Sequence, residues 1–184
     1  MQPFQADHDS IDRNARQNLA KGAVTAGNDA DVAEVIDALN HALATELVCE
    51  LRYRAHYHAA DDEGELNVAG EFLEHAQQER AHGEKLAARI AQLGGQPDFN
   101  PSTLLERSHA DYTKPGSIDK MLEDNLVAER QAIQVYTKLI RWLGDHDPTS
   151  RRLIEEILEQ EEEHADDLAG LRKRLSTRSR GNGV

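Results

Sequence analysis

The chain of 184 residues contains one cysteine, few aromatic residues and no long apolar run. A single cysteine, Cys49, can form neither a disulfide within the chain nor a paired-cysteine zinc site, which fits a reducing compartment. Aromatic residues make up only 4%, and the apolar positions are mainly Leu, Ala and Ile, which favours helices over an all-β fold. Because neither a run of about 18 apolar residues nor a signal-peptide pattern is present, we expect a cytoplasmic protein with no membrane partner.

Positive charge is scarce and unevenly placed. The chain has 21 Lys and Arg against 34 Asp and Glu, which gives a formal net charge of −13. Five basic residues and no acidic residue lie between residues 172 and 184. Because an acidic surface repels phosphates, we expect the body of the protein not to bind nucleic acid, and only the basic carboxy-terminal tail could bind DNA.

Proline is confined to positions 3, 97, 101, 115 and 148, so helix breakers cluster at a few borders. Apolar residues at helical spacing predict four long helices between these borders, at 31–60, 66–93, 117–144 and 147–175. The connection between the second and third helices, 96–116, is too long for a tight hairpin and contains a candidate short helix at 102–107. We therefore predict an all-α fold, a four-helix bundle in which one long crossover joins two helical hairpins.

The bundle is expected to span residues 31–175. Residues 1–30 form an N-terminal extension that is predicted to be partly helical, with a short helix within 10–24. Residues 176–184 are polar and are expected to be a basic disordered tail.

The motif Glu-x-x-His occurs three times, which is more than the roughly one match that chance predicts for this composition. A glutamate and a histidine three residues apart share one face of a helix and can hold the same metal ion. The pair Glu106/His109 lies in the proline-bounded crossover and is interpreted as surface residues without a metal. The other two pairs, Glu79/His82 and Glu161/His164, lie in the second and fourth predicted helices.

An internal repeat connects these two pairs with two further glutamates. Aligning Glu46 with Glu129 also aligns Tyr53 with Tyr136, and each hairpin then carries one Glu on its first helix and Glu-x-x-His on its second. All four glutamates lie on apolar helix stripes, where unpaired burial would cost several kcal/mol each, whereas two divalent cations would neutralise them. Outward-facing glutamates in solvent salt bridges are the alternative. The candidate metal ligands are Glu46, Glu79, His82, Glu129, Glu161 and His164.

Four segments resemble the helices of bacterioferritins, members of the ferritin-like superfamily of di-iron proteins. They are 39–60 (LNHALATELVCELRYRAHYHAA), 79–95 (ERAHGEKLAARIAQLGG), 121–140 (MLEDNLVAERQAIQVYTKLI) and 153–168 (LIEEILEQEEEHADDL). The resemblance implies a ferritin-like bundle whose six ligands hold two irons per subunit, with Glu79 and Glu161 as bridges. It also implies that Tyr53 can donate an electron during catalysis.

The chain departs from the bacterioferritin pattern in three places. Arg80 stands where the haem-binding methionine follows the ligand glutamate, so no haem is expected. Few residues remain for a fifth helix after the fourth, which makes a 12-subunit shell like that of Dps-like proteins more consistent with the sequence than a 24-subunit shell. The lone Cys49 cannot reproduce the cysteine pair of the Dps-like subset that carries a bacterioferritin-type site.

The resemblance implies a ferroxidase, which oxidises Fe(II) with dioxygen or hydrogen peroxide and stores the product in a homo-oligomeric shell. Manganese would suit the same ligands. A rubrerythrin-like peroxidase or manganese catalase without storage is one alternative, and a Dps-like DNA-binding protection protein is another. Of the remaining residues, His75 could assist the site from one turn away, Cys49 is expected to be buried, and His56 and His58 are expected to face solvent.

Overall fold

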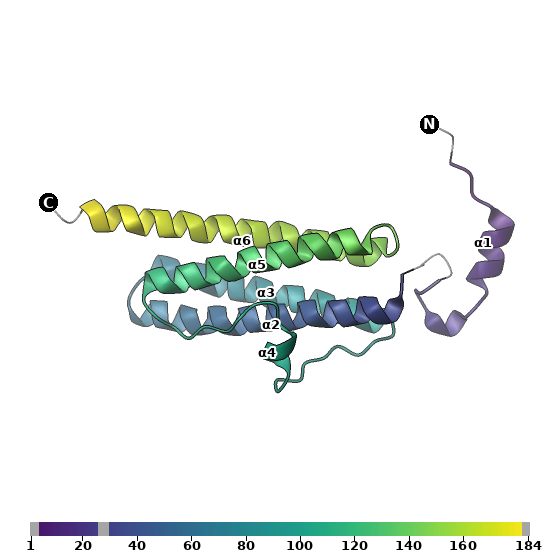
Figure 1. Cartoon of the computed structure of the whole chain (residues 1–184), viewed down its shortest axis with the longest axis horizontal. Coiled ribbons are helices and arrows are strands. Elements are labelled where there is room, and N and C mark those ends of the chain that lie inside the picture. Colours follow the sequence, from purple (N-terminus) through teal and green to yellow (C-terminus); the bar gives the residue numbers. More distant parts are fainter. Residues whose placement is uncertain (1–3, 26–29, 182–184) are drawn as a thin grey trace.

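The computed structural model describes residues 4–25 and 30–181, with side chains through Thr177. Four long helices run side by side along the long axis of the molecule (Figure 1). Helices α2 and α3 form one hairpin, and α5 and α6 form the other, with further contacts between α2 and α5 and between α3 and α6. Their bounds are Val32–Asp62, Leu66–Gln92, Ile118–Leu143 and Pro148–Gly181. The prediction of an all-α four-helix bundle is confirmed.

Local chemistry sets the ends of these helices. The side chain of Asp31 accepts hydrogen bonds from the backbone amides of Ala33 and Glu34, which caps the start of α2. Gly94 ends the second helix at a φ of 85°, a conformation that favours glycine. At Gly95 a Cβ atom would lie 2.8 Å from Cγ2 of Ile36, so only glycine lets the crossover leave α3 this close to α2.

The two largest apolar clusters of the core lie at opposite ends of the bundle, and two smaller ones lie where the crossover packs on it. Along α2, Leu39 and Leu43 belong to the first cluster, and Tyr53 and Ala60 belong to the second. The segment of α2 between them contains the buried Glu46 and Cys49. The bundle therefore encloses a polar layer between two apolar layers, and this layer holds the candidate site.

The crossover, which includes α4 (Leu104–Arg107), packs along α2 and is tied to it by side chains of that helix. Arg52 Nη1 donates to the carbonyl of Asp111 at 2.9 Å, and His56 Nε2 donates to the carbonyl of Thr113 at 3.2 Å. The expectation that His56 faces solvent is therefore wrong, because the crossover covers its side of α2 and leaves it fully buried. His58 is exposed.

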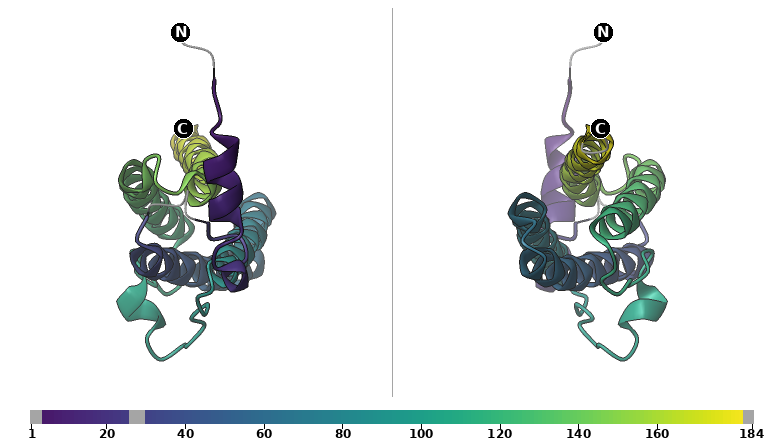
Figure 2. Two further views of the ribbon diagram at one scale, coloured as in Figure 1. Left: turned by 90° about the vertical axis from the view of Figure 1, so that its right-hand side faces the viewer. Right: turned by 90° about the vertical axis from the view of Figure 1, so that its left-hand side faces the viewer.

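The structure of the two ends of the chain differs in part from the structure predicted from the sequence. The expected helix within 10–24 corresponds to α1 (His8–Ala15) and a short 3-10 turn (Leu19–Lys21); α1 buries no residue and lies beyond one end of the bundle (Figures 1 and 2). The expectation of a disordered tail from residue 176 is wrong up to Gly181, because α6 meets no proline or glycine between residues 171 and 180 and simply continues. Residues 182–184 lie outside the described part. None of the described helices is both long and apolar enough to cross a membrane.

Candidate metal centre

The six predicted ligands meet inside the bundle, and each is at most 2% exposed. They form two groups in which one ligand atom per residue lies within 4.8 Å of the others. The first group contains Glu46 and His82, the second contains Glu129 and His164, and both contain Glu79 and Glu161. Glu79 and Glu161 are thus the two residues common to both groups, and their bridging of two ions stays a prediction.

The distances within the groups suit metal ions. His82 Nδ1 lies 3.0 Å from Glu46 Oε2 and 3.1 Å from Glu161 Oε1. His164 Nδ1 lies 3.6 Å from one oxygen each of Glu79 and Glu161. Since metal–ligand bonds to N and O are about 2.0–2.2 Å, two ligand atoms of one ion can lie up to about 4.2 Å apart. These separations therefore allow one cation per group.

Two glutamines orient the histidines from the opposite hairpin. His82 Nε2 donates to Gln160 Oε1 at 2.7 Å, and His164 Nε2 donates to Gln78 Oε1 at 2.8 Å. A neutral imidazole that donates through Nε2 has its lone pair on Nδ1, which is the atom that faces the carboxylates. Neither glutamine was predicted to contact the site, although the repeat contains both as Gln-Glu-x-x-His.

Two tyrosines contact Glu46 and Glu129, the glutamates that each belong to one group only. Each tyrosine comes from the opposite hairpin, as the two glutamines do. The Tyr53 hydroxyl donates to Glu129, and the Tyr136 hydroxyl donates to Glu46. Tyr53 is thus placed against a candidate ligand, as its expected role requires. Tyr136, which the repeat pairs with it, is more than a core residue, because its hydroxyl makes the equivalent contact.

The electrostatics of the centre favour the binding of cations. Burial and the charges of Glu79 and Glu161 raise the pKa of Glu46, and burial with the same two charges raises that of Glu129. Burial alone would lower the pKa of His164, but the nearby carboxylates of Glu161 and Glu79 raise it to about 11. The pKa of His82 is raised by Glu161, Glu46 and Glu79 in the same way.

Several buried ligand atoms have no hydrogen bond, which provides a direct test of whether the residues fit metal. They are Glu79 Oε1, Glu129 Oε2, both carboxylate oxygens of Glu161, and His164 Nδ1. Buried polar atoms are nearly always satisfied, and a missing partner calls for an explanation such as an ion. All five atoms belong to residues of the two groups, so the residues present fit a pair of divalent cations.

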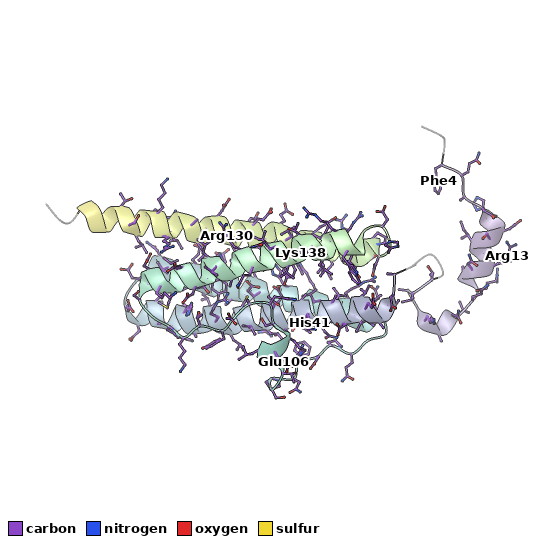
Figure 3. The ribbon with its side chains drawn as sticks, in the orientation of Figure 1. Phe4, Arg13, His41, Glu106, Arg130 and Lys138 are labelled. Atoms are coloured by element: carbon purple, nitrogen blue, oxygen red, sulfur yellow. The ribbon has the colours of Figure 1, made fainter. Side chains whose placement is uncertain are left out.

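Three further residues considered in the sequence, His75, Cys49 and Glu106, differ in their position relative to the metal centre. His75 is buried, its ring stacks on His164 with centroids 4.1 Å apart, and burial with the charge of His164 lowers its pKa to about 3. Cys49 is buried as expected and accepts from Arg52 Nη2 at 3.4 Å. Glu106 lies on α4, on the outer side of the crossover (Figure 3), and belongs to neither metal group.

A second buried polar cluster was missed by the sequence analysis. Arg52 Nε donates to Asn125 Oδ1 at 2.8 Å, and Asn125 Nδ2 donates to His56 Nδ1 at 2.9 Å. All three side chains are fully buried. The cluster joins α2, α5 and the crossover beside the metal centre, and it fixes the position of α5, which carries Glu129.

An all-helical bundle with one long crossover, which encloses four glutamates and two histidines between its hairpins, defines the ferritin-like class of proteins. Comparison with known families gives the same answer, since residues 36–177 match the family described as Ferritin-like domain.

The chain therefore belongs to the ferritin-like family, and the prediction of a ferritin-like, bacterioferritin-type protein is confirmed. It is 28% identical over 135 residues to the bacterioferritin of Rhodobacter capsulatus, covering 73% of this chain and 80% of the relative. It is 32% identical over 139 residues to a DNA protection during starvation protein of Pyrococcus furiosus, covering 73% and 74%. The structure of a dodecameric thioferritin, the bacterioferritin-related protein from Bacteroides fragilis, matches with a TM-score of 0.78 and 30% identity over 85% of this chain and 94% of that chain.

Proposed function

We propose that this protein is a ferroxidase that oxidises Fe(II) at the buried centre, with dioxygen or hydrogen peroxide as oxidant, and that it stores the product in a homo-oligomeric shell. Family membership supports iron oxidation and storage in general. The observation that carries the proposal is the pair of four-residue groups that share Glu79 and Glu161 and leave buried ligand atoms without hydrogen bonds.

Each residue of the centre has a role in this proposal. Two Fe(II) ions bound as substrate would together supply two electrons to one molecule of oxidant. The shared Glu79 and Glu161 would set the separation of the two sites, and burial would exclude bulk water from the reaction. Gln78 and Gln160 keep the histidine Nδ1 atoms directed inward. Tyr53, in contact with Glu129, would supply the second electron to a two-electron oxidant when the bound iron supplies only one.

We propose two iron ions per subunit, with manganese able to occupy the same ligands, and no haem, because Arg80 stands at the haem-methionine position. We further propose a dodecamer rather than a 24-mer. The dodecameric thioferritin that the chain resembles supports this assembly. Twelve chains of 20.5 kDa have a mass of about 246 kDa, against about 492 kDa for 24 and about 41 kDa for two.

Iron titration tests the function. Addition of Fe(II) to the metal-free protein should give rapid oxidation that saturates at two ions per subunit, and Glu129→Ala or His164→Ala should abolish the fast phase while helix content is retained. Glu162→Ala, which removes an exposed carboxylate two residues before His164, is the matched control and should leave the rate unchanged. A Glu129→Ala/His164→Ala double variant that oxidises iron at the parent rate would show that the site is wrongly assigned.

Two other functions remain as alternatives. A rubrerythrin-like peroxidase or a manganese catalase would use the same ligands without storage, and a particle of two chains in light scattering would favour it. The similarity to a DNA protection during starvation protein supports the second alternative, a DNA-binding protection protein. In that case the basic segment 172–180 would bind the duplex, and its removal would abolish DNA binding without affecting iron oxidation.

A further inference from the structure

A third group of metal-ligating side chains lies on the outer surface of the bundle, one residue layer from the centre. Glu71 and His75 come from adjacent turns of α3, and Asp167 comes from α6, one turn after His164. His75 Nε2 lies 3.4 Å from Glu71 Oε1 and 4.0 Å from Asp167 Oδ2. The three ligand atoms lie within 4.8 Å of one another.

We propose that Glu71, His75 and Asp167 bind one divalent transition-metal ion and that this outer site loads the buried centre with Fe(II). The loading role rests on the proposed ferroxidase function, whereas the binding of the ion does not. The side chains of Asp167, Glu71 and His75 are 59%, 27% and 1% exposed, so the cluster leads from solvent into the bundle.

The contacts of the His75 ring direct a lone pair into this cluster. His75 Nδ1 lies 3.2 Å from the Tyr53 hydroxyl oxygen, and that hydroxyl donates its only proton to Glu129. His75 Nδ1 must therefore donate to the tyrosine oxygen, which leaves Nε2 as the acceptor nitrogen of a neutral ring. An acceptor nitrogen and two carboxylates that face one another all present lone pairs, and a cation bound between them would be ligated by all three.

The ligand set indicates which cation would bind. One imidazole nitrogen and two carboxylate oxygens suit Fe(II), Mn(II), Co(II) or Zn(II), whereas Ca²⁺ and Mg²⁺ prefer oxygen ligands alone. Both distances from His75 Nε2 are below the separation of about 4.2 Å that two ligands of one such ion can have. Solvent can fill the remaining coordination positions because Asp167 is exposed.

The arrangement of the rings connects the outer site with the centre. The His75 ring stacks on His164 with centroids 4.1 Å apart, and the His164 ring in turn stacks with His82 at 6.1 Å. Three imidazoles thus lie in a row from the outer cluster to the two metal groups. Fe(II) must reach ligands that are at most 2% exposed, and this row begins at the buried His75, which the exposed Asp167 connects with solvent.

The internal repeat shows that the outer cluster belongs to one side of the bundle only. The alignment that superposes Glu79 on Glu161 places Leu153 opposite Glu71 and Ile157 opposite His75. The same alignment places Lys85 opposite Asp167. Leu153, Ile157 and Lys85 cannot together bind a metal ion. The six ligands of the centre therefore occur in both halves of the repeat, whereas the outer cluster occurs in one half only.

Equilibrium binding of Co(II) to the metal-free protein tests the outer site without any turnover. The parent should bind three ions per subunit, and the Glu71→Gln/Asp167→Asn variant should bind two. The matched control Glu74→Gln/Asp166→Asn makes the same charge change at exposed positions of the same two helices and should retain three. Anomalous scattering from Co(II)-soaked crystals should locate the third ion between Glu71, His75 and Asp167.

Fe(II) oxidation tests the loading role. The Glu71→Gln/Asp167→Asn variant should still oxidise two Fe(II) per subunit in the fast phase, but at a rate reduced roughly tenfold or more, as is typical when groups next to metal ligands are removed. The outer site is refuted if the parent binds only two ions or if the third anomalous peak lies elsewhere, and an unchanged rate in the variant refutes loading. A parent that binds the third ion but lacks fast oxidation would instead contradict the ferroxidase proposal and leave the outer site standing.

Discussion

Binding of a redox-silent cation such as Zn(II) to the centre should release protons, and the structure sets their number. When ionised, the four glutamates carry a charge of −4, which two divalent cations balance in full. Without metal, the raised pKa values of His82 and His164 keep both imidazoles protonated at pH 7, which supplies two positive charges. The raised pKa values of Glu46 and Glu129 allow up to two further protons.

Loading the centre therefore exchanges two cations for about two to four protons. It follows that the overall binding constant for the pair should rise about 10²- to 10⁴-fold per pH unit between about pH 6 and 7.5, because each released proton contributes a factor of ten per unit. The sign is fixed by the direction of the shifts. Groups that hold protons in the metal-free protein compete with the metal, so acid weakens binding.

Calorimetric titration in buffers of different ionisation enthalpy measures the proton count, since the observed heat varies linearly with the buffer enthalpy and the slope is the number released. The Glu71→Gln/Asp167→Asn variant is the suitable background, because only the centre should then bind. Release of fewer than about two protons per pair of ions, or an affinity that does not change between pH 6 and 7, would refute the assignment of imidazolium–carboxylate pairs to the metal-free centre.

Four further predictions concern single features of the structure. Tyr53→Phe should remove a tyrosyl radical signal from electron paramagnetic resonance of the iron-reacted protein, whereas Tyr136→Phe should retain it. His56 has a pKa of about 4, against an ordinary value near 6.5, chiefly because it is buried. The free energy of unfolding should therefore be highest above about pH 6.5 and should fall by up to about 3 kcal/mol as the pH falls towards 4. In urea unfolding, the His56→Gln variant should lose less stability in acid than the parent. Asp147 accepts from the Ser150 amide at 3.0 Å and from Arg89 at 2.9 Å, so Asp147→Ala should lower the free energy of unfolding by about 3–5 kcal/mol, because it leaves a buried cation unpaired; a loss below 1 kcal/mol would contradict this. If DNA binds at all, gel shifts should show a log–log salt slope near −4.5 for five neutralised phosphates per tail, and a smaller slope is expected if Arg172 stays paired with Asp119.

The helices could be predicted because their borders depend on local chemistry. Asp147 followed by Pro148 sets the start of α6, and Gly94 sets the end of α3. Neither border depends on contacts with distant parts of the chain. The six candidate ligands could be predicted for a different reason. Their spacing occurs twice, and two independent helical hairpins would not bury the same acids by chance.

Contacts between distant segments could not be predicted in this way. His56 is buried instead of facing solvent, because the crossover that covers it lies 57 residues further along the chain. The roles of Gln78 and Gln160 depend on histidines of the opposite hairpin, 86 and 78 residues away. A periodic pattern reports which side of a helix is apolar, and it does not report which loop will cover a polar side.

The contacts between the two hairpins at the metal centre also have a consequence for the synthesis of the chain. Tyr53 reaches Glu129, Tyr136 reaches Glu46, and these partners are 76 and 90 residues apart. A ribosome that has released only α2 and α3 has therefore delivered three of the four residues of the first metal group, one of the four of the second, and not yet His164. At 5–20 residues per second, on the order of several seconds pass before α6 emerges. During that interval the nascent chain holds no complete oxidation site, so reactive iron chemistry cannot begin on an unfinished polypeptide.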